Sequence, residues 1–125
     1  MVVDDSIVRG NTSKKIIKML YNAGAKEVHM RVSSPPLVYP CYYGIDMATK
    51  KEFVANHKSL EDIRKFLKVD SLNYLSMNGL VEAVGQSKNK FCFACFNGDY
   101  PVHIPKNLKF DKYSIDKEEK VSSNA

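Results

Sequence analysis

Residues 2–13 decide the fold of this chain, and they read Val2-Val3-Asp4-Asp5-Ser6-Ile7-Val8-Arg9-Gly10-Asn11-Thr12-Ser13. The apolar start is typical of the end of a buried strand. Two carboxylates follow at its carboxyl edge, where open α/β sheets bind ligands. We expect a loop over residues 6–11, in which Gly10 lets backbone N–H groups close on an anion. Thr12 is the expected N-cap of a helix whose positive end points at the same place. The stretch therefore predicts a phosphate-binding loop.

A strand–helix–strand unit extends from this loop. We expect the helix to run to about Ala23 and to stop at Gly24. Its apolar side is formed by Ile16, Ile17, Leu20 and Ala23, and its basic side by Lys14, Lys15 and Lys18. Residues 27–32 alternate, which predicts a strand that buries Val28, Met30 and Val32. Because parallel strands are joined by a crossover, the pattern favours the α/β class, a parallel sheet with flanking helices.

The rest of the chain carries further local signals. Three prolines in residues 33–40 predict an extended loop that delivers Cys41. Capping signals open three short helices: Thr49 with Glu52, Ser59 with Asp62, and Ser76, whose helix ends at Gly85. Residues 72–75 are expected to form one more strand. We divide the chain into residues 1–113, one domain, and residues 114–125, a disordered tail with too few apolar side chains to order itself.

One feature is physically awkward, because the chain begins inside its first strand. A strand of a parallel sheet needs neighbours and covering helices. We therefore expect the domain to be incomplete at its N-terminus.

The composition of the chain narrows the classes of function that it can have. Hydrophobic residues make up 44% and charged residues 26%, as in ordinary globular proteins. The chain has neither a membrane-length apolar run nor a signal peptide, which favours a cytoplasmic protein without a membrane partner. The net charge is +5. Its lysines are scattered and do not interleave with aromatic residues, so we expect a solvated face and no nucleic-acid partner.

Carboxylates beside a phosphate cradle need a ligand that carries more than phosphate. A ribose 5-phosphate ester suits both the loop and the carboxylates. Its phosphate would lie in the loop and its hydroxyls on Asp4 and Asp5, with Mg²⁺ nearby. Two alternatives are an ordinary Asp-Asp turn before a capped helix and a receiver domain, whose sheet edge also carries paired acids. A receiver domain does not predict the Gly-Asn-Thr loop behind the pair.

The three cysteines form a second candidate site. Cys92 and Cys95 have the C-x-x-C spacing that lets two thiolates hold one metal centre, and the proline loop can bring Cys41 to them. Three thiolates do not complete a tetrahedral zinc site or a four-cysteine cluster. Metal binding with a fourth ligand from elsewhere, a buried pair of small apolar side chains, and a redox motif all remain open.

Residues 2–13 resemble the phosphoribosyl-pyrophosphate motif of type I phosphoribosyltransferases, and Asp-Asp-Ser-Ile-Val-Arg-Gly is similar to the amidophosphoribosyltransferase version. The likeness continues through residues 33–36, 40–47 and 92–96, in family order, and covers about residues 1–105. It implies the C-terminal part of the type I phosphoribosyltransferase fold. Asn11 departs from the family, which usually has Thr there, and we expect a changed hydrogen bond at that position.

The resemblance also implies a function. It is that of a glycosyltransferase of de novo purine biosynthesis, which forms 5-phosphoribosylamine, pyrophosphate and glutamate from phosphoribosyl pyrophosphate, glutamine and water. Asp4 and Asp5 would be the catalytic residues and Mg²⁺ ligands. The residues implied to bind phosphoribosyl pyrophosphate are Asp4, Asp5, Ser6, Ile7, Val8, Arg9, Gly10, Asn11, Thr12 and Ser13. Ammonia would come from glutamine through an N-terminal glutaminase domain that this chain lacks.

One branch of the family carries a structural, oxygen-sensitive [4Fe–4S] cluster, and Cys41, Cys92 and Cys95 lie where three of its ligands are expected. The family further implies a homotetramer. We expect the chain to be inactive by itself. The alternative function is a non-enzymatic module that binds metal or phosphate.

Overall fold

The computed structural model describes residues 1–45 and 50–105 of the chain. The expected disordered tail and the Thr49 cap lie outside these residues. No helix of the described part is long and apolar enough to cross a membrane.

A parallel sheet of three short strands forms the centre of the fold. The strands are β1 (Val2–Asp4), β2 (His29–Val32) and β3 (Ser71–Tyr74), in the order β1-β2-β3. Their register places Asp4 beside Val32, and Val32 beside Tyr74, so all three carboxyl ends meet at one edge. The α/β class with a parallel sheet is therefore confirmed.

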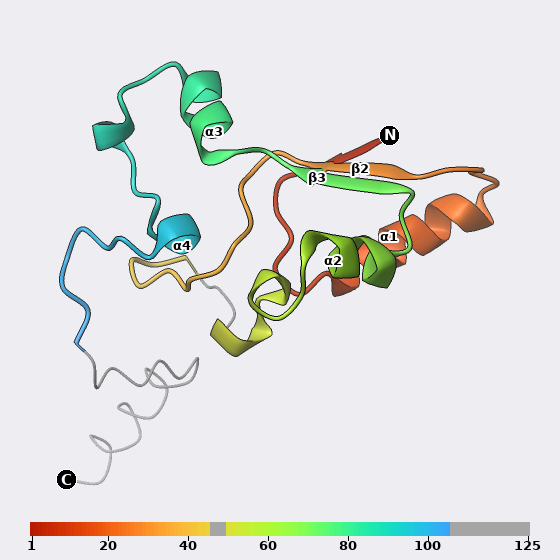
Figure 1. The fold of residues 1–125 in the computed structure, drawn as a ribbon, viewed down its shortest axis with the longest axis horizontal. Coiled ribbons are helices and arrows are strands. Elements are labelled where there is room, and N and C mark those ends of the chain that lie inside the picture. Colours follow the sequence, from red (N-terminus) through yellow and green to blue (C-terminus); the bar gives the residue numbers. More distant parts are fainter. Residues whose placement is uncertain (46–49, 106–125) are drawn as a thin grey trace, which may run out of the picture.

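Two helices connect the strands and pack on the same side of the sheet (Figure 1). Helix α1 (Asn11–Asn22) leads from β1 to β2, and α2 (Leu60–Leu67) precedes β3. The hydrophobic core lies between the sheet and the helices, and its members include Ile17, Met30, Val32, Ile63, Leu67 and Leu72. The alternation predicted for residues 27–32 is confirmed. The expectation of a buried first strand is wrong for Val3, which is 68% exposed because it points away from the helices.

Helix α1 begins two positions earlier than its sequence suggested. Gly10, at φ 77°, is the N-cap, and no side chain caps the helix. The predicted Thr12 cap is therefore wrong, because the left-handed glycine turns the chain directly into the first turn. The predicted stop is confirmed. Gly24 has φ 95°, and the N–H groups of Gly24 and Ala25 bond back to Tyr21 and Leu20, a Schellman motif.

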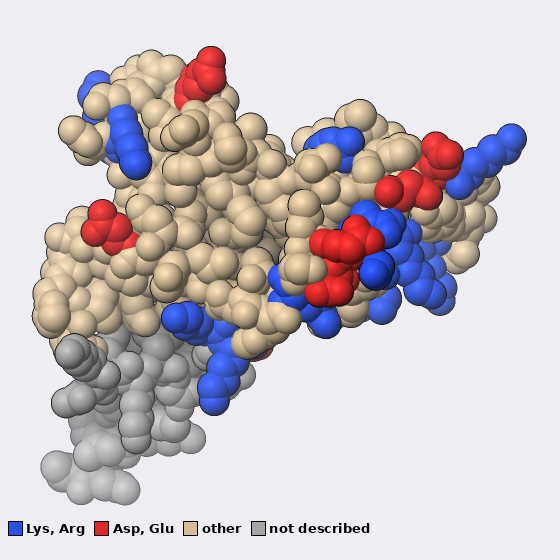
Figure 2. All heavy atoms as spheres, viewed as in Figure 1, with Lys and Arg blue, Asp and Glu red and all other residues tan. Residues whose placement is uncertain are grey.

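The two sides of α1 were only partly predicted. Ile17 is buried, and the three lysines are exposed, as expected. Ile16 is 41% exposed and Ala23 is exposed too, because Ser13, Ile17 and Leu20 form the side that faces the core. Figure 2 shows basic side chains over α1 and beside the acidic side chains of α2.

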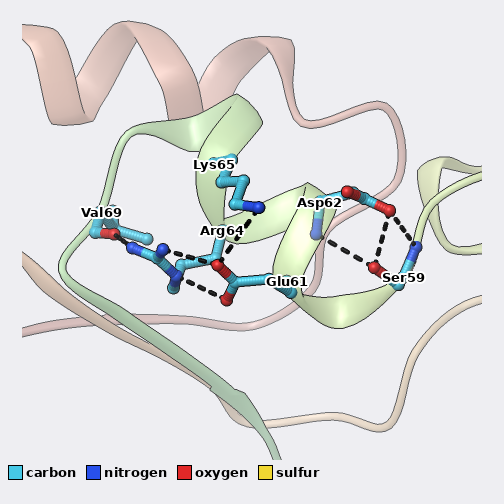
Figure 3. Close-up of polar contacts among 6 residues, drawn as sticks. All are labelled: Ser59, Glu61, Asp62, Arg64, Lys65 and Val69. Carbon is cyan, nitrogen blue, oxygen red and sulfur yellow. Dashed lines mark hydrogen bonds and ion pairs between the residues drawn. The ribbon is translucent and has the colours of Figure 1, made fainter.

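Helix α2 has the capping box that Ser59 and Asp62 predicted (Figure 3). Ser59 Oγ accepts from the Asp62 N–H at 3.1 Å, and the Asp62 carboxylate accepts from the Ser59 N–H at 3.3 Å. Further along, Arg64 donates twice to the Glu61 carboxylate and once to the Val69 carbonyl. Each contact holds an end of α2, so local chemistry fixes both its start and its exit.

The remaining elements lie beyond the carboxyl edge of the sheet (Figure 1). Helix α3 (Met77–Val84) starts at Ser76 and stops at Gly85, as predicted. Helix α4 (Ala94–Asn97) contains Cys95. The helix expected after Thr49 consists of two 3₁₀ turns, Lys50–Glu52 and Val54–Asn56, because Phe53 between them is extended.

Asp70 joins the far end of α1 to the two strands beside it. Its carboxylate accepts from the Val28 N–H at 2.7 Å and from the Tyr21 hydroxyl at 2.8 Å. These bonds, the Val28 N–H first, hold the pKa of Asp70 below its ordinary value of 3.8. Because the folded state binds this proton less readily than the unfolded state, the stability that Asp70 contributes is present above that value and is lost as the pH falls below it.

We therefore expect Asp70→Asn to flatten the acid end of the stability curve. Urea unfolding of the chain at about pH 6 and about pH 3.5 measures the loss of stability on acidification, and this loss should be smaller in the variant than in the wild type. Glu61 and Asp62, whose pKa values are also lowered, remain in both proteins and cancel in the comparison. Equal losses in the two proteins would contradict this role.

Candidate functional site

The two candidate carboxylates lie at the carboxyl edge of the sheet, as predicted. Asp4 is half-buried, and its two oxygens accept from the Asp5 N–H at 3.0 Å and from Ser13 Oγ at 3.4 Å. Asp5 is exposed. The Asp4 carbonyl accepts from both the N–H and the hydroxyl of Ser33, which fixes this strand end against the loop after β2. One carboxylate is thus held by the fold and the other faces solvent.

The loop after the carboxylates is anchored by its apolar members. Ile7 is 2% exposed and belongs to the core, so it contributes only its backbone to the site. Gly10 is buried against Phe66, and a Cβ at this glycine would lie 3.1 Å from the Phe66 ring. The loop therefore runs in a fixed course from the sheet edge to the start of α1.

The start of α1 offers backbone donors at the end of this loop. No side chain caps the helix, and no acidic residue lies in its first turn. Asn11 and Thr12 are exposed, whereas Ser13 is buried beside Asp4. Uncapped N–H groups and the helix dipole together favour an anion such as a phosphate. The geometry can hold a phosphate at the helix start and hydroxyl groups or a divalent cation at the carboxylates.

The cysteines lie in and around α4, beyond the carboxyl edge of the sheet (Figure 1). The Val38 and Tyr39 N–H groups both donate to the Cys95 carbonyl, so the proline loop packs on α4 and brings Cys41 close. Burial raises the pKa of the Cys95 thiol, and the nearby Cys41 and Cys92 raise it further. Within residues 1–45 and 50–105, no group of three or more His, Cys, Asp or Glu side chains is arranged to hold a metal ion.

Sequence reasoning missed the tyrosines that surround Cys41. Tyr100 donates to the Pro40 carbonyl at 2.7 Å and packs against Tyr42 in a tilted arrangement, with ring centroids 5.1 Å apart. Burial raises the pKa of Tyr100 to about 12. Tyr43 exchanges hydrogen bonds with Val102. These contacts fasten residues 100–102 over the Cys41 loop, and no signal short of the three-dimensional packing pairs these positions.

The contacts of the histidines are not with the candidate carboxylates or the cysteines. His29 contacts Ser71 and Glu27 on the side of the sheet opposite α1 and α2. His57 contacts the Lys51 carbonyl, and His103 is exposed.

The chain is similar in sequence and fold to amidophosphoribosyltransferases. That of Synechococcus elongatus is 50% identical over 115 residues, which are 92% of this chain and 23% of the relative. The Methanocaldococcus jannaschii enzyme is 54% identical over 104 residues, 83% of this chain and 22% of the relative. The solved glutamine phosphoribosyl-pyrophosphate amidotransferase of B. subtilis, complexed with ADP and GMP, has a TM-score of 0.78 and 47% identity, covering 85% of this chain and 24% of that one. No protein-family model matches. The chain spans less than a quarter of the length of these relatives.

Proposed function

We propose that this chain is the phosphoribosyl-pyrophosphate-binding part of an amidophosphoribosyltransferase, and that its activity requires the other three quarters of such an enzyme. The observation that carries the proposal is the juxtaposition of Asp4 and Asp5 with the uncapped start of α1. The similarity to amidophosphoribosyltransferases over most of the chain supports it.

In this proposal the loop binds the 5′-phosphate and thereby orients the ribose. The contacts come from backbone N–H groups of residues 6–13 and from the side chains of Ser6, Asn11 and Thr12. The phosphate is remote from carbon 1, where ammonia displaces pyrophosphate. Its binding energy therefore serves orientation, which lowers the entropic part of the barrier.

Asp4 and Asp5 act at the ribose itself. Their carboxylates accept hydrogen bonds from the 2′ and 3′ hydroxyls and face the positive charge that develops on the ring in an oxocarbenium-like transition state. Carboxylate oxygens are also ligands that Mg²⁺ prefers, and bound Mg²⁺ would stabilise the departing pyrophosphate. Ammonia would come from glutamine at a glutaminase domain outside this chain. A homotetrameric assembly and a cytoplasmic location remain predictions.

The proposal can be tested in a chimeric enzyme. In this chimera, the chain replaces the matching quarter of the Synechococcus elongatus amidophosphoribosyltransferase. We expect the chimera to release pyrophosphate only when both glutamine and phosphoribosyl pyrophosphate are present. The unmodified Synechococcus enzyme is the positive control. A folded chimera without this activity would overturn the proposal, and phosphoribosylamine formation by the isolated chain would overturn the requirement for the remaining domains.

We further propose that Cys41, Cys92 and Cys95 provide three ligands of a [4Fe–4S] cluster, with the fourth from outside the chain. The shared neighbourhood of the three thiols and the flanking Phe91 and Phe93, whose rings pack edge to face 6.4 Å apart, support this. A protein that carries such a cluster binds its iron through cysteine thiolates.

Metal analysis of the chimera distinguishes iron from zinc. After anaerobic reconstitution with iron and sulfide, the wild-type chimera should retain iron and show broad visible absorption, and chelation of the iron should remove both. Cys92→Ala should lower the bound iron severely, whereas the control Ser87→Ala on the same loop should not. Retention of zinc in place of iron, or unchanged iron in Cys92→Ala, would contradict the cluster assignment.

A further inference from the structure

The outer side of the phosphate loop rests on a segment that lies more than forty positions later in the chain. The Val54 N–H donates to the Val8 carbonyl at 2.8 Å. One residue further along the loop, the Arg9 guanidinium pairs with the Glu52 carboxylate at 2.5 Å. In Figure 1 this segment lies beneath the loop that leaves β1. Two successive loop residues are therefore held by the same distant segment.

This supporting segment, residues 50–57, is itself firmly fixed. Phe53 is fully buried and Val54 is 7% exposed. The Asn56 side-chain amide donates to the carbonyls of Lys50 and Val38, both at 2.9 Å. Because Asn56 closes the segment on itself and ties it to the proline loop, the segment offers Val8 and Arg9 a rigid surface.

We propose that Glu52 is a positioning residue for phosphoribosyl pyrophosphate, an inference that rests on the proposed function. Residues 5–10 form neither helix nor strand, so no regular backbone ladder sets their conformation. An anion cradle of N–H groups works only when its donors are aligned before the ligand arrives. Glu52 keeps Arg9 on the outer side of the loop and so maintains the curvature that turns the N–H groups inward.

The pair should influence binding more than folding. The Arg9 and Glu52 side chains are 53% and 39% exposed, and ion pairs at this exposure contribute little to stability. An effect on substrate affinity without an effect on unfolding is therefore the signature of positioning. Glu61 provides a matched control, because it forms an ion pair of similar exposure with Arg64 on α2 without contacting the phosphate loop.

The test compares Glu52→Gln, Glu52→Asp and Glu61→Gln in the chimeric enzyme. Glu52→Gln should raise the KM for phosphoribosyl pyrophosphate about three- to fivefold, the range that one exposed ion pair can supply, and leave kcat and the unfolding temperature near wild type. Glu52→Asp keeps the charge and should recover part of the loss. Glu61→Gln should leave this KM unchanged.

Two results would overturn the inference, and they differ in what they say of the proposed function. If the wild-type chimera is active and Glu52→Gln has the same KM as Glu61→Gln, Glu52 does not position the loop and the proposed function stands. If the folded wild-type chimera has no activity, the proposed function fails, and the role of Glu52 fails with it.

Discussion

Asp4→Asn and Asp5→Asn should each lower the kcat of the chimeric enzyme by about 10²- to 10³-fold, the usual cost of removing one group that stabilises a developing charge. Both carboxylates lie at the strand edge where the ribose is proposed to bind. An amide is isosteric with a carboxylate but has no negative charge to oppose the positive charge on the ring. The loss should therefore appear mainly in kcat.

Folding should tolerate the change at Asp4. The Asn side chain keeps one oxygen that can accept from the Asp5 N–H. Its NH₂ group can donate to Ser13 Oγ, because a hydroxyl oxygen can accept a hydrogen bond as well as donate one. Asp99→Asn is the matched control, since Asp99 is an exposed aspartate that follows α4 and lies outside residues 4–13. Steady-state kinetics and thermal unfolding of the three variants are compared. Near-wild-type turnover in both Asp4→Asn and Asp5→Asn would refute their catalytic roles.

Gly10→Ala should weaken binding of phosphoribosyl pyrophosphate about tenfold or more and also destabilise the chain. Gly10 has φ 77°, a conformation that costs an L-residue roughly 1–2 kcal/mol. In addition, the new Cβ would lie 3.1 Å from Phe66 and 3.5 Å from Leu67. The loop must move to relieve this contact, and its N–H groups move with it.

Gly24→Ala separates the effect of backbone strain from the effect of the contact between the new Cβ and its neighbours. Gly24 also has a positive φ, 95°, but an added Cβ there meets no atom within 4 Å. This control should lose stability through backbone strain alone and keep its KM. Combining Gly10→Ala with Phe66→Leu should recover part of the lost affinity, because the smaller side chain can yield. If Gly10→Ala and Gly24→Ala have the same KM, the geometry at Gly10 does not matter for binding.

The elements that the sequence predicted well are those whose chemistry is local. Ser59 and Asp62 lie three positions apart and cap each other, and Gly85 ends α3 through its own backbone freedom. The alternation around Met30 likewise needs only the two-residue period of a strand. In each of these cases the residues that determine the structure are near neighbours in the chain.

The predictions that failed depended on distant parts of the chain. A helical wheel grouped Ile16 with Ile17, but the position of α2 and the sheet decides that only Ile17 is buried. The pairing of Glu52 with Arg9 was not predicted, because the two residues are far apart in the chain. The cap predicted between Thr49 and Glu52 lies outside the described residues. Thr12 has the right chemistry for an N-cap, but a preceding left-handed glycine takes that position.

The two candidate sites also differ in whether their residues are close together in the sequence. Residues 4–13 are contiguous, so a motif reveals both the carboxylates and the helix start. The surroundings of Cys41 come from Tyr42, Cys95 and Tyr100, which only folding brings together. Their contacts could not be inferred from spacing.

The order of the strands has a consequence for how this chain acquires its structure. Among the described residues, each strand pairs with the strand that follows it in the sequence. The second crossover is longer than the first, yet the entropy of closing it is greater by only about 0.4 kcal/mol, because this cost grows with the logarithm of loop length. Within this part of the sheet, β2 and then β3 can therefore be added to β1 and α1 in the order in which they are synthesised.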